Sequence, residues 1–406
     1  MRNRIRLDSN EGQLLVTSLT VAFGVATQTM LMLLSPLYAI SLGAGAGQVG
    51  LLISLTYVLP LLLALPIGSL VDRLGSKGPI IAACAALALA PALVWAIPGL
   101  VTLAVVQALA GVAQLTLVVA SQRHVSELGR GAKSERNFGW YTTFQSAGQL
   151  AGPLLGGVLV DTLAQPLPFL ITGALAAVAV VIAQGLRNLE PIGSTPSKRV
   201  GARNEVRAML NNYGVRMGIA ISCGVLLALA ARQSMLPVYL EELDFAATTI
   251  GLLISFRALV SMLVRPFMPA ILARFGGRAT TAFLMVVMLA VGLGMNSFAT
   301  TIIPLLISAA LIGIGSGITQ PLSMVTITDY VQRDRVGFAL GLRLTANRLA
   351  QSLSPALIGV VAERAGIPWA FAVAAGTLLI TAGLIWYWKA PFEKAELALQ
   401  QAHSSD

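Results

Sequence analysis

The stretch PLYAISLGAGAGQVGLLISLTYVLPLLLALPIGSLVDRLGSK, residues 36–77, contains three patterns that return 201 positions further along the chain. The matching pairs are Pro36-x-Tyr38 with Pro237-x-Tyr239, Gly50-Leu51-Leu52-Ile53-Ser54 with Gly251-Leu252-Leu253-Ile254-Ser255, and Arg73-x-Gly75 with Arg274-x-Gly276. Because this fixed offset is about half of the 406-residue chain, it indicates one unit that is used twice.

The composition shows which solvent surrounds this unit. Hydrophobic residues make up 56% of the chain and charged residues only 11%, whereas soluble domains carry about 25% charged residues. Apolar runs long enough to cross a hydrocarbon core of ~30 Å as helices recur throughout, and they lack the alternating pattern of barrel strands. We therefore expect an all-α polytopic membrane protein.

Twelve spans fit the apolar runs, six in each half. In the first half they cover residues 12–40, 47–72, 78–97, 100–122, 137–160 and 166–186, and in the second 214–240, 247–273, 279–297, 301–328, 337–362 and 367–388. The expected domains are an N-terminal six-helix bundle at 1–186, a linker at 187–213, a C-terminal six-helix bundle at 214–388 and a tail at 389–406. Within the linker, both a short interfacial helix and a solvated loop remain open.

Basic residues set the orientation, because connections on the cytoplasmic side carry an excess of Lys and Arg. One set of connections holds Arg2, Arg4, Arg6, Arg73, Lys77, Arg123, Arg274, Arg278, Lys389 and Lys394, among others. The opposite set has a single arginine, Arg364, together with acids such as Asp161 and Glu241. We expect both termini in the cytoplasm and a bacterial-type inner membrane. This topology explains the net charge of +10 without any nucleic-acid partner.

Cysteine and histidine offer no catalytic or metal-binding pattern. Cys84 and Cys223 lie in apolar runs, and His124 and His403 are far apart. The cysteines are expected to be small packing residues. No metal cluster and no nucleophile–base pair is evident, so we expect no cofactor and no enzymatic activity.

Three local patterns lie on particular spans. They are Gly68-x-Leu70-Val71-Asp72-Arg73-Leu74-Gly75-Ser76-Lys77 after the second span, Gln107-x-x-x-Gly111 in the fourth, and Gly148-x-x-x-Gly152-Pro153-x-x-Gly156-Gly157 in the fifth. With the duplicated six-span unit, they resemble the major facilitator superfamily over nearly the whole chain. The first pattern resembles that family's signature loop, and the third resembles the antiporter motif of its drug/proton antiporter branch. The resemblance implies a monomeric transporter that works by alternating access.

The signature loop implies a conformational latch made of Gly68, Asp72, Arg73, Gly75 and Lys77. In the family's fold, Asp72 would lie near the start of span eleven, at Gly337, where a carboxylate meets the positive end of a helix dipole. The second copy has Ala273 in place of Asp72, so the latch would act on one side only. A positive-inside turn with an incidental acid is the alternative.

The glycines of the antiporter motif are spaced to clear one helix face, and Pro153 permits a bend. This face is either a gasket between the halves or ordinary small-residue packing. Gln107 departs from the family, which commonly has an arginine here. Because glutamine cannot carry that charge, ordinary proton coupling through this position is in doubt.

Arginines are the main ionisable groups inside the predicted spans. Counting ~1.5 Å per residue, we place Arg232, Arg257 and Arg348 within a few ångströms of the midplane. Arg265 and Arg343 are expected nearer the cytoplasmic face, where snorkelling or pairing with Asp329 is sufficient. A central charge costs about 2.5–3.5 kcal/mol on insertion scales, so each arginine needs a partner, water or a function.

These arginines predict a positively charged cavity that binds an anion through forked guanidinium contacts. Amide side chains would complete the lining: Gln28, Gln107, Gln114, Gln145, Gln149, Gln320 and Asn347. The alternative is that the arginines bond to carbonyls and amides and fix the helix packing.

The sequence thus favours an exporter of small organic or amphiphilic, anionic compounds. Uptake or exchange of organic anions is the alternative within the class, and a lipid flippase or a non-transporting receptor lies outside it. Proton or counter-ion coupling would use the cargo itself, Asp72 or Asp329, or play no part.

Overall fold

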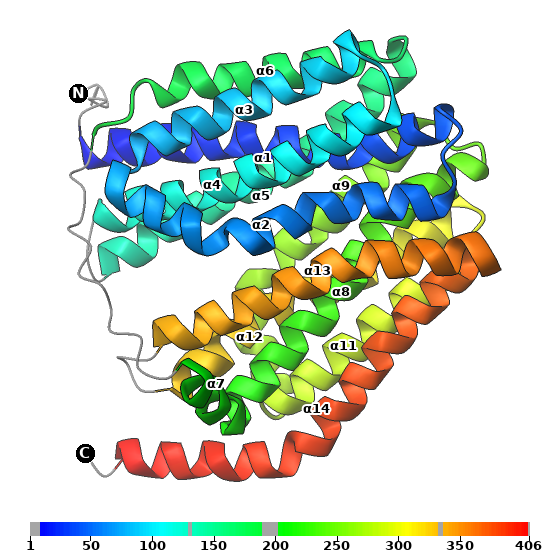
Figure 1. Cartoon of the computed structure of the whole chain (residues 1–406). Helices are drawn as coiled ribbons and strands as arrows, with labels where there is room; N and C mark the ends of the chain where they lie inside the picture. Colours follow the sequence, from blue (N-terminus) through cyan, green and yellow to red (C-terminus); the bar gives the residue numbers. More distant parts are fainter. Residues whose placement is uncertain (1–8, 129–131, 189–201, 332–335, 405–406) are drawn as a thin grey trace, which may run out of the picture. The chain divides into compact units, whose positions relative to one another are not determined.

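Every described element of the chain is helical in this computed structural model, which describes residues 9–128, 132–188, 202–331 and 336–404 (Figure 1). The helices of the first half are α1 (Asn10–Ser41), α2 (Ala46–Leu74), α3 (Lys77–Ala96), α4 (Leu100–Glu127), α5 (Ala132–Thr162) and α6 (Leu167–Ala183). Each overlaps one predicted span, which confirms the all-α polytopic class. Nine helices among the described residues are long and apolar enough to cross a membrane, and α6 is a shorter apolar helix.

The described residues of the rest of the chain give six helices in the same order and three further short elements. It comprises α7 (Ala202–Asn211), α8 (Tyr213–Glu242), α9 (Ala247–Val264), the 3-10 turn η1 (Arg265–Phe267), α10 (Met268–Arg274), α11 (Arg278–Met295), α12 (Ile302–Asp329), α13 (Val336–Ala365) and α14 (Ile367–Ser404). The predicted span 247–273 is therefore interrupted. Pro266 and Pro269 stand at the interruption, and a proline lacks the N–H that a continuous helix needs.

The linker and the tail both contain helix. In the linker, α7 buries Met209 in a cluster with Val215, Ile327 and Ala339. At the other end, α14 continues past the predicted span, and Figure 1 shows its last part turning away from the rest of the helix. There Phe392 is fully buried and stacks on Tyr330, with ring centroids 4.9 Å apart.

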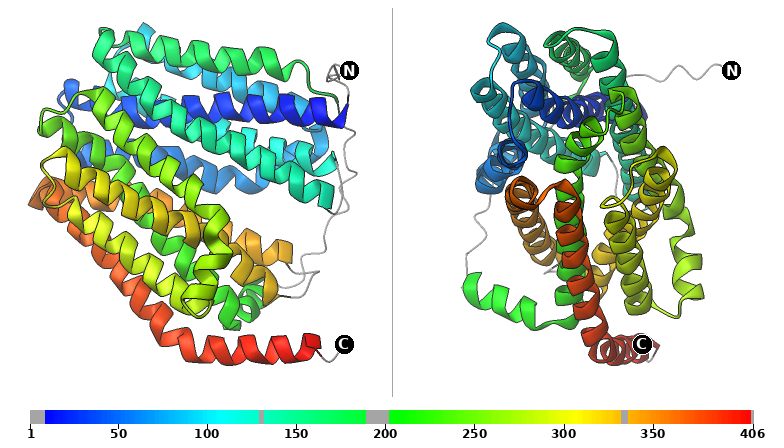
Figure 2. Two further views of the ribbon diagram at one scale, coloured as in Figure 1. Left: turned by 180° about the vertical axis from the view of Figure 1, so that it is seen from behind. Right: turned by 90° about the vertical axis from the view of Figure 1, so that its right-hand side faces the viewer.

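The chain divides into two compact units. The first unit comprises residues 1–196 with 233–258, and the second comprises residues 197–232 with 259–406. In the first, α1 packs on α4, α5 and α6, while α3 packs on α4 and α6 (Figure 2). In the second unit, α11 packs on α12 and α14, and α13 also packs on α12 and α14. The last part of α8, from residue 233, and the first part of α9, up to residue 258, thus belong to the unit built from the first sequence copy.

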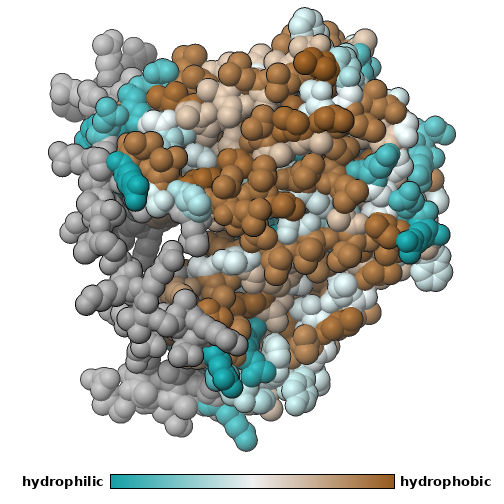
Figure 3. Space-filling view, in the orientation of Figure 1, coloured by the Kyte–Doolittle hydropathy of each residue, from teal (hydrophilic) through white to brown (hydrophobic). Residues whose placement is uncertain are grey.

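Close contact between α1 and α5 depends on glycine. A Cβ added at Gly148 or Gly152 would overlap the carbonyl oxygens of Ala22 or Ala26, and the Thr29 hydroxyl donates to Gly148 O at 3.4 Å. Small residues allow such approach in membrane proteins, where packing rather than hydrophobic burial drives helix association. Apolar side chains also dominate the exposed face in Figure 3, as lipid contact requires.

The α1–α5 contact yields a stability prediction with a matched control. We expect Gly152→Ala to destabilise the protein by about 1–3 kcal/mol, because the added methyl group overlaps Thr29 and Ala26. Gly139 lies in the same helix with nothing within 4 Å of an added Cβ, so Gly139→Ala should be neutral or slightly stabilising. Thermal unfolding in detergent measures both variants, and equal shifts would contradict the packing argument.

Candidate functional site

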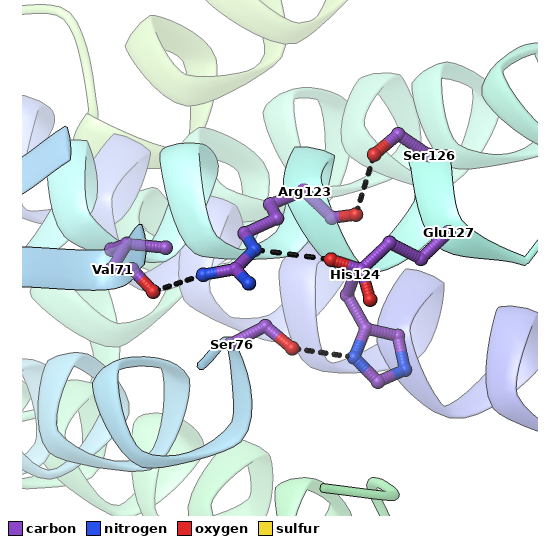
Figure 4. Close-up of polar contacts among 6 residues, drawn as sticks. All are labelled: Val71, Ser76, Arg123, His124, Ser126 and Glu127. Carbon is purple, nitrogen blue, oxygen red and sulfur yellow. Dashed lines mark hydrogen bonds and ion pairs between the residues drawn. The ribbon is translucent and has the colours of Figure 1, made fainter. Parts of the chain in front are cut away.

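The turn that connects α2 to α3 is held in place by α4 (Figure 4). Gly75 adopts a positive φ of 79°, a region that favours glycine. On one side of the turn, a guanidinium N–H of Arg123 donates to Val71 O, and its Nε lies 3.1 Å from Glu127 Oε1. On the other side, the ring of His124 bonds to Ser76, the N-cap residue of α3, at 2.8 Å.

His124 is the centre of a buried hydrogen-bond network. Its Nε2 lies 3.2 Å from Gln13 Oε1, which also accepts from the Arg187 N–H at 2.7 Å. An amide oxygen can only accept, so Nε2 carries the hydrogen and Nδ1 accepts from the Ser76 hydroxyl. Gln13 Nε2 donates to Gly185 O at 3.0 Å. The network therefore joins α1, α3 and α4 to the segment that follows α6.

The predicted latch residues have different surroundings. Lys77 Nζ donates to Gln184 O at 2.9 Å, so its charge meets the C-terminal end of α6 in the same unit. Arg73 is exposed, and nothing lies within 4 Å of a Cβ added at Gly68. The side chain of Asp72 and the surroundings of Gly337 lie outside the described residues. The latch stays a prediction.

The antiporter motif has two packing faces. Gly148, Gly152 and Gly156 face α1, where an added Cβ would meet Ala22, Ala26 or Leu34. A Cβ at Gly157 would instead overlap Ala247 O at the start of α9. From α9, a Cβ at Gly251 would overlap Pro153 O. The motif thus combines packing within one sequence copy with a contact to the other.

Buried arginine is present in the second unit. Arg343 of α13 is 2% exposed; its Nε and Nη2 donate to Ser323 Oγ at 3.1 and 2.8 Å, and Nη2 lies 3.2 Å from Gln320 Oε1. The sequence predicts that Arg343 either snorkels to the cytoplasmic face or pairs with Asp329. Arg343 is buried beside Ser323 and Gln320 instead, so this prediction is wrong. Asp329, at the end of α12, pairs with Arg278 at 2.6 Å, while Ser323 and Gln320 of the same helix lie beside Arg343.

The other predicted cavity arginines are buried to different extents. Arg232 of α8 is 4% exposed, while Arg257 and Arg348 are half-buried. Arg232 and Arg348 belong to the second unit and Arg257 to the first. Their convergence on one cargo stays a prediction.

The amide side chains also differ. Gln28 and Gln107 are buried, and neither side-chain amide has a hydrogen-bond partner among the described residues. The same holds for Gln114 Oε1 and Gln320 Nε2. Asn347 Oδ1 accepts from Ser222 Oγ at 2.8 Å, and Gln145 and Gln149 are half-buried. An unpaired buried amide is costly, so Gln28 and Gln107 are the amides best suited to a ligand or water.

A bundle of apolar helices, nine of them among the described residues long and apolar enough to cross a membrane, defines the class as a polytopic membrane protein. The family model of the Major Facilitator Superfamily matches residues 16–301 and, in a second overlapping match, residues 219–403. The chain belongs to this superfamily.

Two curated relatives align along most of the chain. A multi-drug resistance efflux pump PmrA homolog of Lactococcus lactis is 23% identical over 404 residues, covering 95% of this chain and 96% of that protein. An uncharacterized MFS-type transporter of Methanocaldococcus jannaschii is 20% identical over 367 residues, covering 89% and 93%.

Solved structures share the fold at low identity. The nucleoside transporter NupG has a TM-score of 0.73 at 15% identity, covering 93% of this chain and 98% of that chain. A bacterial homolog of the human lysosomal transporter Spinster has 0.77 at 13%, covering 95% and 98%. The human organic anion transporter MFSD10 has 0.64 at 16%, covering 93% and 99%. At these identities the likeness shows the fold.

Disruption of the His124 network should destabilise the first unit. His124→Leu leaves the Ser76 hydroxyl and one lone pair of Gln13 Oε1 unpaired in a buried site, so we expect a loss of about 1–3 kcal/mol in thermal unfolding. Ser126 lies two residues away, and its exposed hydroxyl donates to Arg123 O. Ser126→Ala should stay within about 0.5 kcal/mol. An unchanged His124→Leu protein would show that the network contributes nothing to stability.

Proposed function

We propose that this protein is a secondary active transporter that exports small organic or amphiphilic anions by alternating access. It would lie in a bacterial-type inner membrane with both termini in the cytoplasm. The observation that carries the proposed cargo charge is the burial of Arg232, which is 4% exposed on α8, in a half of the chain whose predicted spans contain no aspartate or glutamate.

The charge balance of the second half supports this choice of cargo. Its six predicted spans contain arginines such as Arg232, Arg257 and Arg348, and no aspartate or glutamate. A buried positive charge is costly unless it is compensated. Carboxylate and phosphate groups compensate arginine well, because the guanidinium donates two parallel hydrogen bonds to them. A negative cargo would therefore be favoured over a positive one.

Export is favoured by two similarities. The fifth helix carries the pattern Gly148-x-x-x-Gly152-Pro153-x-x-Gly156-Gly157, which resembles the antiporter motif, and the Lactococcus relative is named as an efflux pump. Anion exchange is the second candidate. It is favoured by Gln107, a buried neutral amide where the family commonly has a charged residue.

Counterflow in proteoliposomes tests the cargo charge. We expect faster exchange of organic anions than of matched cations. Arg232→Ala and Arg348→Ala should each lower anion counterflow by about tenfold, the loss expected for one charged hydrogen bond. Arg348→Lys should recover part of the rate, because it keeps the charge and loses the fork.

The matched control is Arg364→Ala, which removes an exposed arginine from the same helix as Arg348. It should leave anion counterflow unchanged. Cation transport that is efficient and indifferent to Arg232→Ala and Arg348→Ala would contradict the anion proposal.

The driving force is tested separately with vesicles of defined pH. For a proton-coupled exporter, a proton gradient directed against cargo movement should accelerate transport of a fully ionised anion. Acceleration by a second anion on the far side, with no response to the pH gradient, would instead support anion exchange.

A further inference from the structure

The carboxylate of Asp161 joins the end of α5 to the start of α9. Its Oδ1 accepts from the Ala247 N–H at 2.8 Å, and its Oδ2 accepts from the Thr248 N–H at 2.7 Å. The first N–H groups of a helix have no partner within the helix, and a negative charge there is stabilising. Asp161 therefore acts as an N-terminal cap that comes from a different helix.

The contact continues along both helices beyond this cap. Gly157 approaches the Ala247 carbonyl, and Gly251 approaches the Pro153 carbonyl, so closely that a Cβ at either glycine would overlap. Further along, the Ser255 hydroxyl donates to Leu150 O at 2.6 Å. We call these contacts the α5–α9 seam. All of its residues belong to the first compact unit.

The seam joins the two sequence copies. Gly157 and Pro153 belong to the antiporter motif of the first copy, while Gly251 and Ser255 belong to the repeated Gly-Leu-Leu-Ile-Ser stretch of the second. Asp161 and Ala247 lie at the ends of helices that the sequence predicts to face outward. A transporter that moves one copy against the other must open this seam whenever its site faces outward.

Asp161 is suited to reversible contact. Asp161 is exposed, so water can take the place of the Ala247 and Thr248 N–H groups as hydrogen-bond donors to its carboxylate when α9 moves away. Hydrogen bonds from backbone N–H groups favour the ionised carboxylate, so the charge that caps α9 is present at neutral pH. A buried ion pair would be harder to break, since separation would leave an uncompensated charge.

We propose that Asp161 is a positioning residue for the outer gate, by which we mean the α5–α9 seam at its outward end. The Asp161 carboxylate holds the start of α9, from the second copy, against the end of α5, from the first, and releases it when the outward-facing state forms. This inference rests on the alternating-access cycle of the proposed function and is independent of the cargo. Loss of the two hydrogen bonds from Asp161 to α9 shifts the population toward the state in which the seam is open.

A cysteine reporter in the seam measures this shift. Cys84 and Cys223 are replaced by serine, and Ala247, which is 6% exposed, is replaced by cysteine, which leaves its backbone N–H in place. A membrane-impermeant maleimide is added to the outside of vesicles. We expect Asp161→Asn and Asp161→Ala to raise the labelling rate by about threefold or more, and Asp161→Glu to restore slow labelling in part.

The matched control is Asp244→Asn, an equal charge change in the turn that precedes α9. Asp244 has a positive φ of 59°, which asparagine also adopts, and labelling should match that of the parent protein. Should the Asp161 variants fail to fold, Ser255→Ala removes another bond of the seam and should raise labelling as well. Unchanged labelling in folded Asp161→Asn and Ser255→Ala proteins would overturn the proposal.

The labelling assay needs no cargo, so the two proposals fail separately. Faster labelling of Asp161→Asn, without anion counterflow in the parent protein, would support the role of Asp161 in the outer gate and contradict the proposed export of anions. Anion counterflow in the parent protein, together with unchanged labelling of the Asp161 and Ser255 variants, would support transport of anions and contradict the role of Asp161 in the outer gate.

Discussion

The described helices are held together where small residues let their backbones approach closely. Lipid tails are as apolar as leucine, so helices in a bilayer gain little from hydrophobic burial and associate by packing and hydrogen bonds. Gly148 and Gly152 bring α5 against α1, and Gly157 brings it against α9. Because α5 contacts both partners, the antiporter motif is at once part of the first bundle and part of the seam.

The polar contacts divide by their exposure. His124, Gln13 and Ser76 are fully buried and hydrogen-bonded to one another, so water cannot replace their bonds. The network therefore fixes the turn between α2 and α3 on α4. Asp161 is exposed, so its bonds to α9 are replaceable. The proposed alternating-access cycle would use both kinds of contact: buried bonds would keep each bundle together as it moves, and exposed bonds between the sequence copies would break and re-form.

The sequence predicts the fold well because the bilayer sets the length and composition of each span, and because Gly50–Ser54 returns as Gly251–Ser255. Side-chain partners are harder to predict. His124 looks isolated in sequence, since its partners Gln13 and Ser76 meet it only after folding, and Arg343 lies where α12 presents Ser323 and Gln320 instead of Asp329. Gln107, predicted to line the site, is buried with an unpaired amide, whereas the convergence of Arg232, Arg257 and Arg348 still awaits a test.

Guanidinium groups in the membrane are proposed to select a negatively charged cargo. Equilibrium binding of one carboxylic acid and its uncharged methyl ester to the purified protein, at the same neutral pH, measures this selection most directly. We expect the ionised acid to bind about tenfold more tightly than the ester, and the difference to shrink in the Arg232→Ala, Arg348→Ala double variant. Equal affinities for acid and ester in the parent protein would rule out selection of the cargo by its negative charge.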